Sequence, residues 1–237
     1  MFPYDAALLA AVRVVPQSLD DVLEIMRGAN AILPDGDGLK WFHRLYLQVT
    51  EAVAQRVAAG GFSDPAWMAA LDVQFARLYL AALTQTLEGG NPPACWQVMF
   101  DRRADVRVAR IQFALAGMNA HINHDLPFAI VNTCRATGGA PDRGPHYADY
   151  TALNSTLAAI VDTAKRELNV RLLGDALPPL SHLEDTLAAF GVTAARENAW
   201  TGAEILWMPA PLSGGYKLTL EGWPTALGKT LLVPVPV

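Results

Sequence analysis

The segment from Gly117 to Pro127 places two histidines, an aspartate and two asparagines in an otherwise apolar stretch of the chain. Polar groups of this kind are costly to bury unless each has a hydrogen-bond partner or a function. On a helix, His121, His124 and Asp125 share one face, and Gly117 leaves space beside them one turn earlier. The pattern therefore predicts a polar centre inside a hydrophobic helical protein.

Two kinds of chemistry suit this face, and a structural role is the third interpretation. His121 and Asp125 can bind one divalent metal ion such as zinc, iron or manganese, because imidazole and carboxylate groups are common ligands of these ions. The same pair can act as a base with its orienting carboxylate near neutral pH, with His124 assisting. Alternatively, the side chains pair with each other and fix helix packing. The spacing lacks the glutamate of the HExxH zinc motif, so it does not select among the three.

Asn119 and Asn123 lie on the opposite face of the same helix, together with Gln112. We interpret this stripe first as a packing device, because carboxamides can satisfy backbone groups of neighbouring helices. The alternative is that Asn119 and Asn123 form hydrogen bonds to a bound ligand.

Further polar side chains are candidates for a site. Asp149 stands at the start of a predicted helix, where it either caps that helix or supplies a second carboxylate to the catalytic centre. Asp72 and Tyr79 share one side of another apolar helix, so we expect either a buried pair or an acidic group in a ligand pocket. Tyr46 is a further candidate for that pocket. His43, in contrast, is expected to be a hydrogen-bonded core histidine.

The segments that must position these residues have the periodicity of helices. Their ends are marked by capping residues such as Ser18 and Asp64 and by glycine or proline. Helices are expected at about 18–29, 39–59, 64–88, 94–102, 104–126, 147–170, 181–190 and 193–207. Pro127 either ends the 104–126 helix or only kinks it, in which case the helix extends to Cys134.

The C-terminal part of the chain has a different pattern. From residue 209 onward proline and glycine recur, and Tyr216, Leu218 and Leu220 alternate with other residues, which predicts an extended arm or a small hairpin. The fold class is therefore all-α, with a single multi-helix bundle over residues 1–208 around a buried central helix. Residues 209–237 are expected as an extended C-terminal arm packed on the same domain.

The composition excludes several classes of protein. Of the 237 residues, 52% are hydrophobic and 17% are charged, which is enough apolar surface for a large core. The net charge of -5 and the lack of a basic run argue against nucleic-acid and membrane partners. No apolar run is long enough to span a membrane, and two distant cysteines fit a reducing compartment, so we expect a cytoplasmic protein. Phosphate-binding and serine-hydrolase motifs are absent.

Several of these residues also form a wider pattern. It comprises the run from Gln112 to Pro127 together with Asp37-Gly38, Phe42, Tyr46, Thr50, Phe62, Asp72, Phe75-Ala76, Tyr79, Trp96, Asp149-Tyr150, Asn154 and Ala195–Trp200. With these residues the chain resembles the bacterial family called domain of unknown function 5995 over nearly its whole length. The resemblance implies a single helical domain of bacterial origin, and it brings no established activity.

A second, local resemblance concerns chemistry. Glycine, then His-x-x-x-Asp, then proline on a buried helix is similar to the core of zinc-dependent phospholipase C and P1-type nucleases, which are helical enzymes with a metal cluster. This resemblance implies that His121 and Asp125 are metal ligands. The chain departs from that motif because the proline comes two residues early and Phe128 stands where a histidine is expected. If the site holds metal, these departures therefore favour one or two ions over three.

Taken together, the residues predict a cytoplasmic enzyme that acts on a small molecule, of hydrolase or lyase/cyclase type, with or without a divalent metal ion. His121, His124, Asp125 and Asp149 are its expected catalytic residues. Two alternatives stay open: a binding protein for a hydrophobic small molecule, and a structural protein in which the polar cluster is a buried hydrogen-bond network.

Overall fold

The computed structural model describes residues 2–168 and 191–234. Every regular element in these ranges is helical and none is a strand, so the predicted all-α fold is confirmed. The elements are α1 (Asp5–Val12), α2 (Leu19–Ile32), α3 (Leu39–Ala58), α4 (Pro65–Leu87), α5 (Ala94–Phe100), α6 (Arg110–Ala120), the π-helical turn η1 (His121–Asp125), α7 (Leu126–Thr137), α8 (Pro145–Thr151), α9 (Asn154–Glu167), α11 (Val192–Trp207) and α12 (Leu212–Leu231).

The N-terminal helices begin at the capping residues that the sequence indicates. Ser18 Oγ accepts a hydrogen bond from the Asp21 N–H at 3.1 Å, and the Asp21 carboxylate accepts the Ser18 N–H at 3.0 Å. This reciprocal pair satisfies two backbone donors that a helix start leaves free. Asp64 caps α4 by accepting the Trp67 N–H at 2.9 Å, and Pro65 occupies the first helical position.

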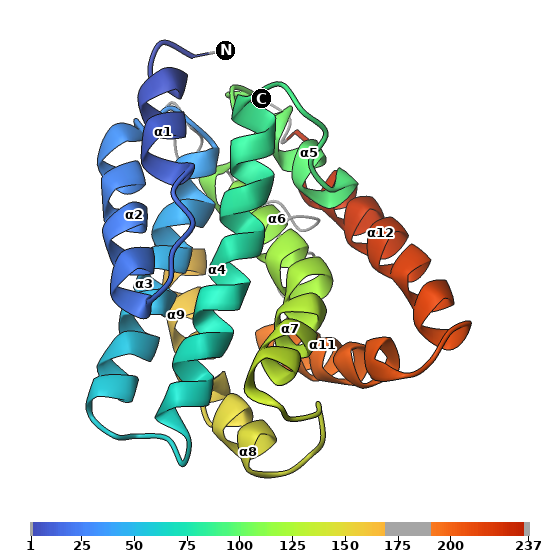
Figure 1. The fold of residues 1–237 in the computed structure, drawn as a ribbon. Helices are drawn as coiled ribbons and strands as arrows, with labels where there is room; N and C mark the ends of the chain where they lie inside the picture. The colour runs from blue at the N-terminus through green and yellow to red at the C-terminus, as the bar shows by residue number, and fades with distance from the viewer. Residues whose placement is uncertain (1, 169–190, 235–237) are drawn as a thin grey trace.

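The predicted central helix is present, and α6, η1 and α7 form it as one continuous rod (Figure 1). Helices α3 and α12 pack on α6, whereas α4 and α11 pack on α7. Within α6, every residue after Arg110 is buried. The helix begins at Arg110 rather than near residue 104, because residues 104–109 form turns in which Val108 N–H bonds to the Asp105 carbonyl at 3.0 Å.

Pro127 does not end this helix, which continues to Thr137. A proline in a regular α-helix removes one N–H donor, and its ring collides with the carbonyl four residues earlier. Here the preceding turn is a π-turn, in which the Leu126 N–H bonds to the carbonyl of His121. The wider turn relieves that collision, so the helix passes through the proline.

The expectation of an extended C-terminal arm is wrong, because residues 212–231 form the long helix α12. The alternation around Leu218 indicated a strand, but the residues that are buried lie at helical spacing: Leu220, Pro224, Gly228 and Leu231. This stripe packs α12 against α5 and α6, and its lower end meets α11 (Figure 1). The core therefore extends to the last helix.

The predicted helix over 147–170 is divided into α8 and α9. At the break, the backbone carbonyl of Tyr150 accepts a hydrogen bond from Arg196 Nη2 at 2.8 Å. The predicted helix at 193–207 is present as α11, and the one expected from Ser181 lies outside the described residues. In the described part of the chain, no helix combines the length and the apolar character that crossing a membrane requires.

Candidate active site

Asp125 is the centre of a buried polar cluster. Its Oδ2 accepts hydrogen bonds from His121 Nδ1 at 3.1 Å and from Trp96 Nε1 at 3.0 Å. Its Oδ1 accepts a bond from His124 Nδ1 at 2.7 Å. Because an ionised carboxylate can only accept, both histidines carry a proton on Nδ1. The structure thus brings together the three residues that the sequence places on one face.

The cluster occupies the π-turn of the central helix, since His121 is the first residue of η1 and Asp125 is the last. Single π-turns inside α-helices are rare and occur frequently at functional sites. All of these cluster side chains are buried, so their interactions are little screened by water.

The pKa values of the two histidines of the cluster are shifted in opposite directions. Burial lowers the pKa of His121 below the ordinary value of 6.5, and the bond to Asp125 does not offset this effect. Burial also disfavours charge on His124, but contacts with Asp125 and with Glu221, 3.7 Å from Nε2, outweigh it and raise the pKa. Burial would raise the pKa of Asp125, yet the hydrogen bonds from both histidines keep it lowered. Asp125 is therefore ionised and His121 is neutral at pH 7.

His121 has one ring nitrogen without a partner. Nδ1 bonds to Asp125, whereas Nε2 is buried and makes no hydrogen bond in the described structure. The ring stacks on Phe75 with centroids 3.4 Å apart and contacts the edge of Tyr46 at 4.4 Å. In the neutral tautomer with the proton on Nδ1, Nε2 is a free acceptor.

His121 lines a cavity of about 50 Å³, which we call the His121 cavity. A second cavity of about 40 Å³, the Asp72 cavity, adjoins it. Five residues line both cavities: Tyr46, Val49, Phe75, Leu157 and Arg196. The rest of both walls is aliphatic, aromatic or methionine apart from His121 and Asp72 themselves. Two apolar cavities that each include a few polar groups are the candidate for a small-molecule site.

Asp72 is a buried acid without a hydrogen-bond partner at Oδ2 in the described structure. Burial raises its pKa from the ordinary 3.8 to about 7. The expected Asp72–Tyr79 pair is not made, because the Tyr79 hydroxyl bonds to His43 Nδ1 at 2.9 Å. His43 Nε2 donates to the carbonyl of Met26 at 2.8 Å, which confirms His43 as a hydrogen-bonded core residue.

Tyr79 and the asparagines do not line either cavity. Asn119 Nδ2 donates to the Pro224 carbonyl on α12 at 2.7 Å, and Asn123 Nδ2 donates to Asn119 Oδ1 at 2.9 Å. Gln112 Nε2 donates to the carbonyl of Leu231 at 2.8 Å, at the end of the same helix. The carboxamide stripe therefore joins α6 to α12, as the packing interpretation expects.

Asp149 lies apart from the cluster, at the start of α4. Its two carboxylate oxygens accept the N–H groups of Ser63 at 2.9 Å and of Asp64 at 2.7 Å. It thereby joins α8 to the start of α4 rather than capping its own helix. Both oxygens are used in this way, so Asp149 does not assist His121.

The space expected beside Gly117 is filled. A Cβ atom on Gly117 would lie 2.2 Å from Cγ of Phe42, so the glycine makes room for that ring. Gly117 therefore serves close helix packing between α6 and α3, and the cavities lie elsewhere around His121.

Arg196 is a site residue that the sequence reasoning missed. It lines both cavities, and the residue is only 6% exposed. The available signal was its position on the buried face of α11, which also contains Val192, Ala195, Ala199, Trp200 and Ala203.

The donor set does not match a metal site in which His121 and Asp125 are paired ligands. Nδ1 of His121 and the carboxylate of Asp125 bond to each other, which leaves only Nε2 free. Across residues 2–168 and 191–234, no group of three or more His, Cys, Asp or Glu side chains could hold a metal ion. The local resemblance to zinc-dependent phospholipase C is therefore not supported.

The fold and site define an all-helical protein with a His–Asp–His cluster on a π-turn beside two small cavities. The chain belongs to DUF5995, a family of unknown function, whose model matches residues 19–234 of 237. This match confirms the predicted family and includes the whole cluster and both cavities. No curated protein and no solved structure matches the chain.

Proposed function

We propose that this protein is an acid–base enzyme acting on a small molecule, with His121 as its base. The observation that carries the proposal is the free Nε2 of a buried, neutral histidine at the wall of a cavity. A neutral imidazole with a free acceptor nitrogen is the form in which a histidine acts as a general base.

The cluster around His121 supports the proton transfer. The bond from Nδ1 to Asp125 fixes the tautomer that leaves Nε2 able to accept a proton from the bound molecule. The imidazolium that forms then lies next to an ionised carboxylate, which stabilises its charge. Trp96 and His124 hold that carboxylate in place by hydrogen bonds of 3.0 and 2.7 Å.

Asp72 is the matching acid in this proposal. Its pKa of about 7 keeps a large share of the carboxyl group protonated at neutral pH, so it can return a proton to the bound molecule. Neighbouring groups whose surroundings push their pKa values in opposite directions commonly share acid and base roles. None of the described lining residues is Ser, Thr, Cys or Lys, which favours a lyase or cyclase over a hydrolase with a covalent intermediate.

The cavity walls and volumes favour a small, partly apolar substrate. Because a buried water needs ~10–15 Å³ of such space, cavities of about 50 and 40 Å³ admit only a few water-sized groups each. We place this activity in the cytoplasm of a bacterium, without nucleic-acid or membrane partners. The net charge of -5 and the two free, buried cysteines support that setting.

The test is activity profiling with a matched histidine control. Wild type, His121→Gln and His146→Gln are each incubated with a pool of small bacterial metabolites, and consumed compounds are identified by mass spectrometry. His146 bonds to Asp64 and lines neither cavity, so its variant controls for the loss of a histidine. We expect at least one compound to be consumed by wild type and His146→Gln but not by His121→Gln.

A binding protein for an apolar small molecule is the second candidate, which the apolar walls of both cavities favour. The same samples distinguish the two. If wild type retains a compound unchanged and His121→Gln does not retain it, the result supports binding. If, in addition, wild type consumes no compound, the result contradicts catalysis.

A further inference from the structure

Arg196 is a buried cation without a carboxylate within ion-pair distance in the described structure. Its Nε donates to Asn154 Oδ1 and its Nη2 donates to the Tyr150 carbonyl, both at 2.8 Å. Both acceptors are neutral, and these bonds use two of the five N–H groups of a guanidinium. A buried charge in this state is costly, so the unused donors call for a partner.

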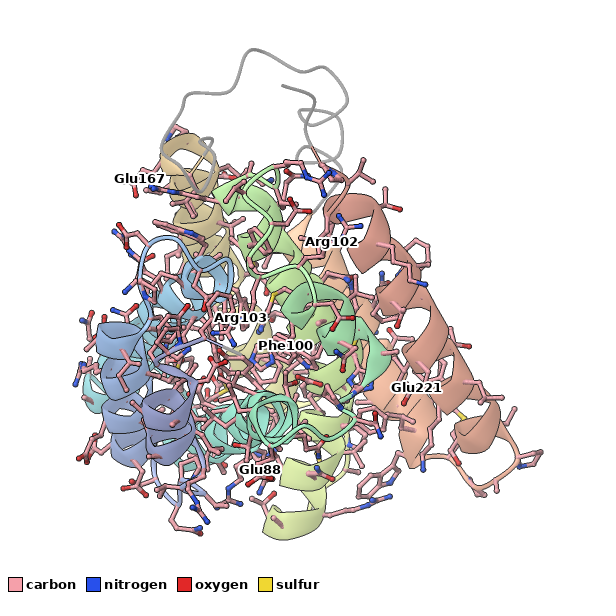
Figure 2. All side chains as sticks on the ribbon, turned by 90° about the horizontal axis from the view of Figure 1, so that it is seen from above. Glu88, Phe100, Arg102, Arg103, Glu167 and Glu221 are labelled. Carbon is pink, nitrogen blue, oxygen red and sulfur yellow. The ribbon has the colours of Figure 1, made fainter. Side chains whose placement is uncertain are left out.

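Arg103 shows how this chain compensates its other buried arginine. Figure 2 labels Arg103 in the interior, where it forms ion pairs with Asp37 and with Asp5, the latter at 3.1 Å. Burial alone would lower the pKa of Arg103, but these carboxylates outweigh burial and raise it. Burial lowers the pKa of Arg196, and the charge of the neighbouring Glu197 does not offset it. Arg103 and Arg196 are 7% and 6% exposed, and of the two only Arg103 contacts a carboxylate in the described part of the chain.

The guanidinium of Arg196 lines the same cavities as the proposed base His121 and the proposed acid Asp72. Arg196 lines the His121 cavity and the Asp72 cavity, and its Cζ lies 3.8 Å from the Tyr150 ring centroid. That cation–π contact and the two hydrogen bonds fix the orientation of the guanidinium. Asp72, the only carboxylic acid among the described residues that line the Asp72 cavity, forms no ion pair with Arg196.

We infer that the small molecule bound in these cavities carries a carboxylate and that Arg196 binds it. This inference rests on the proposed function of the cavities. A guanidinium presents paired N–H groups that match the two oxygens of a carboxylate, and such charge-assisted bonds are strong in a dry site. The apolar walls around it suit the aliphatic part of a small monocarboxylate better than a fully polar anion such as phosphate.

The test compares butyrate with butyramide, which has nearly the same shape and no charge. Binding is followed at pH 6 by NMR of the methyl groups of Ile122 and Val192, which line the His121 cavity, with Leu8 on α1 as a remote control. We expect wild type to bind butyrate at least about 10-fold more tightly than butyramide. Arg196→Met should abolish this preference, and Arg196→Lys should keep part of it.

Equal affinity of wild type for both compounds would overturn the carboxylate assignment. If both compounds still shift the methyl signals of Ile122 and Val192, the cavity and the proposed function stand without the carboxylate assignment. If neither compound shifts these methyl groups, the assignment fails as well, and the metabolite experiment decides the proposed function independently. The wild-type comparison uses no variant, so it remains decisive even if Arg196→Met does not fold.

Discussion

His121 and Asp125 begin and end a single π-helical turn, and the hydrogen bond between them leaves the second nitrogen of His121 free at a cavity wall. The same carboxylate holds His124, whose raised pKa favours its charged form. Asp125 therefore has two roles, since it orients the ring of the neutral His121 and favours the charged form of His124.

This double role predicts unequal costs of substitution. Asp125→Ala should lower the free energy of unfolding by about 3–5 kcal/mol, because it leaves the buried His124 without its counter-charge. His121→Gln should cost about 1–2 kcal/mol, since it removes one hydrogen bond and keeps the carboxylate. Urea unfolding at pH 7 measures both values. Equal costs would show that His121 is as structural as Asp125.

Asp72 predicts a dependence of stability on pH. Its pKa is 3.8 in ordinary surroundings and about 7 in the fold, so the unfolded chain loses this proton first as the pH rises. The protonated Asp72 therefore makes its full contribution to stability below pH 3.8. This contribution is lost as the pH rises to about 7, and the free energy of unfolding falls by up to about 4 kcal/mol.

The Asp72→Asn variant lacks this titration. Relative to wild type, it should become progressively more stable between pH 5 and pH 8, as measured by urea unfolding at each pH. Parallel curves for the two proteins would mean that Asp72 has an ordinary pKa or a partner.

Two glycine substitutions should change the stability of the protein in opposite directions. Gly117→Ala places a Cβ 2.2 Å from Phe42 Cγ, and this overpacking should destabilise the protein by about 1–3 kcal/mol. Gly28→Ala, on the exposed face of α2 with nothing within 4 Å, should stabilise it by about 0.5–1 kcal/mol. Thermal unfolding compares them directly. A neutral Gly117→Ala would mean that the ring of Phe42 can move away at no cost.

Metal content separates the metal interpretation of the cluster from the acid–base and structural interpretations. Because His121 and Asp125 bond to each other, we expect protein purified without a chelator or a His-tag to contain no stoichiometric zinc, iron or manganese. Elemental analysis by mass spectrometry tests this expectation. One ion per chain in wild type that is lost in both His121→Ala and Asp125→Ala would restore the metal interpretation.

Local patterns in the sequence predict much of the fold and the centre of the site. Capping residues such as Ser18 and Asp64 locate helix starts, because their hydrogen bonds involve neighbours in the chain. The grouping of His121 with Asp125 follows from spacing along one helix. The alternation near Leu218 was misleading, because the helical stripe at Leu220 and Pro224 covers the same residues.

The cavities and Arg196 could not be predicted in the same way. Their walls come from α3, α4, α9 and α11 as well as from the central helix of α6, η1 and α7, and these segments of the sequence meet only through packing. Asp149 shows the same limit, since its partners at Ser63 and Asp64 lie more than 80 residues away.

The most direct test of the account is the protonation state of His121. Long-range ¹H–¹⁵N NMR of the histidine rings, assigned with the His121→Gln variant, reports the tautomer and the pKa of each ring. The account predicts that His121 is neutral at pH 7 with its proton on Nδ1, titrating below 6.5, and that His124 titrates above 6.5. A charged His121 at pH 7, or a proton on Nε2, would contradict the role of His121 as the base.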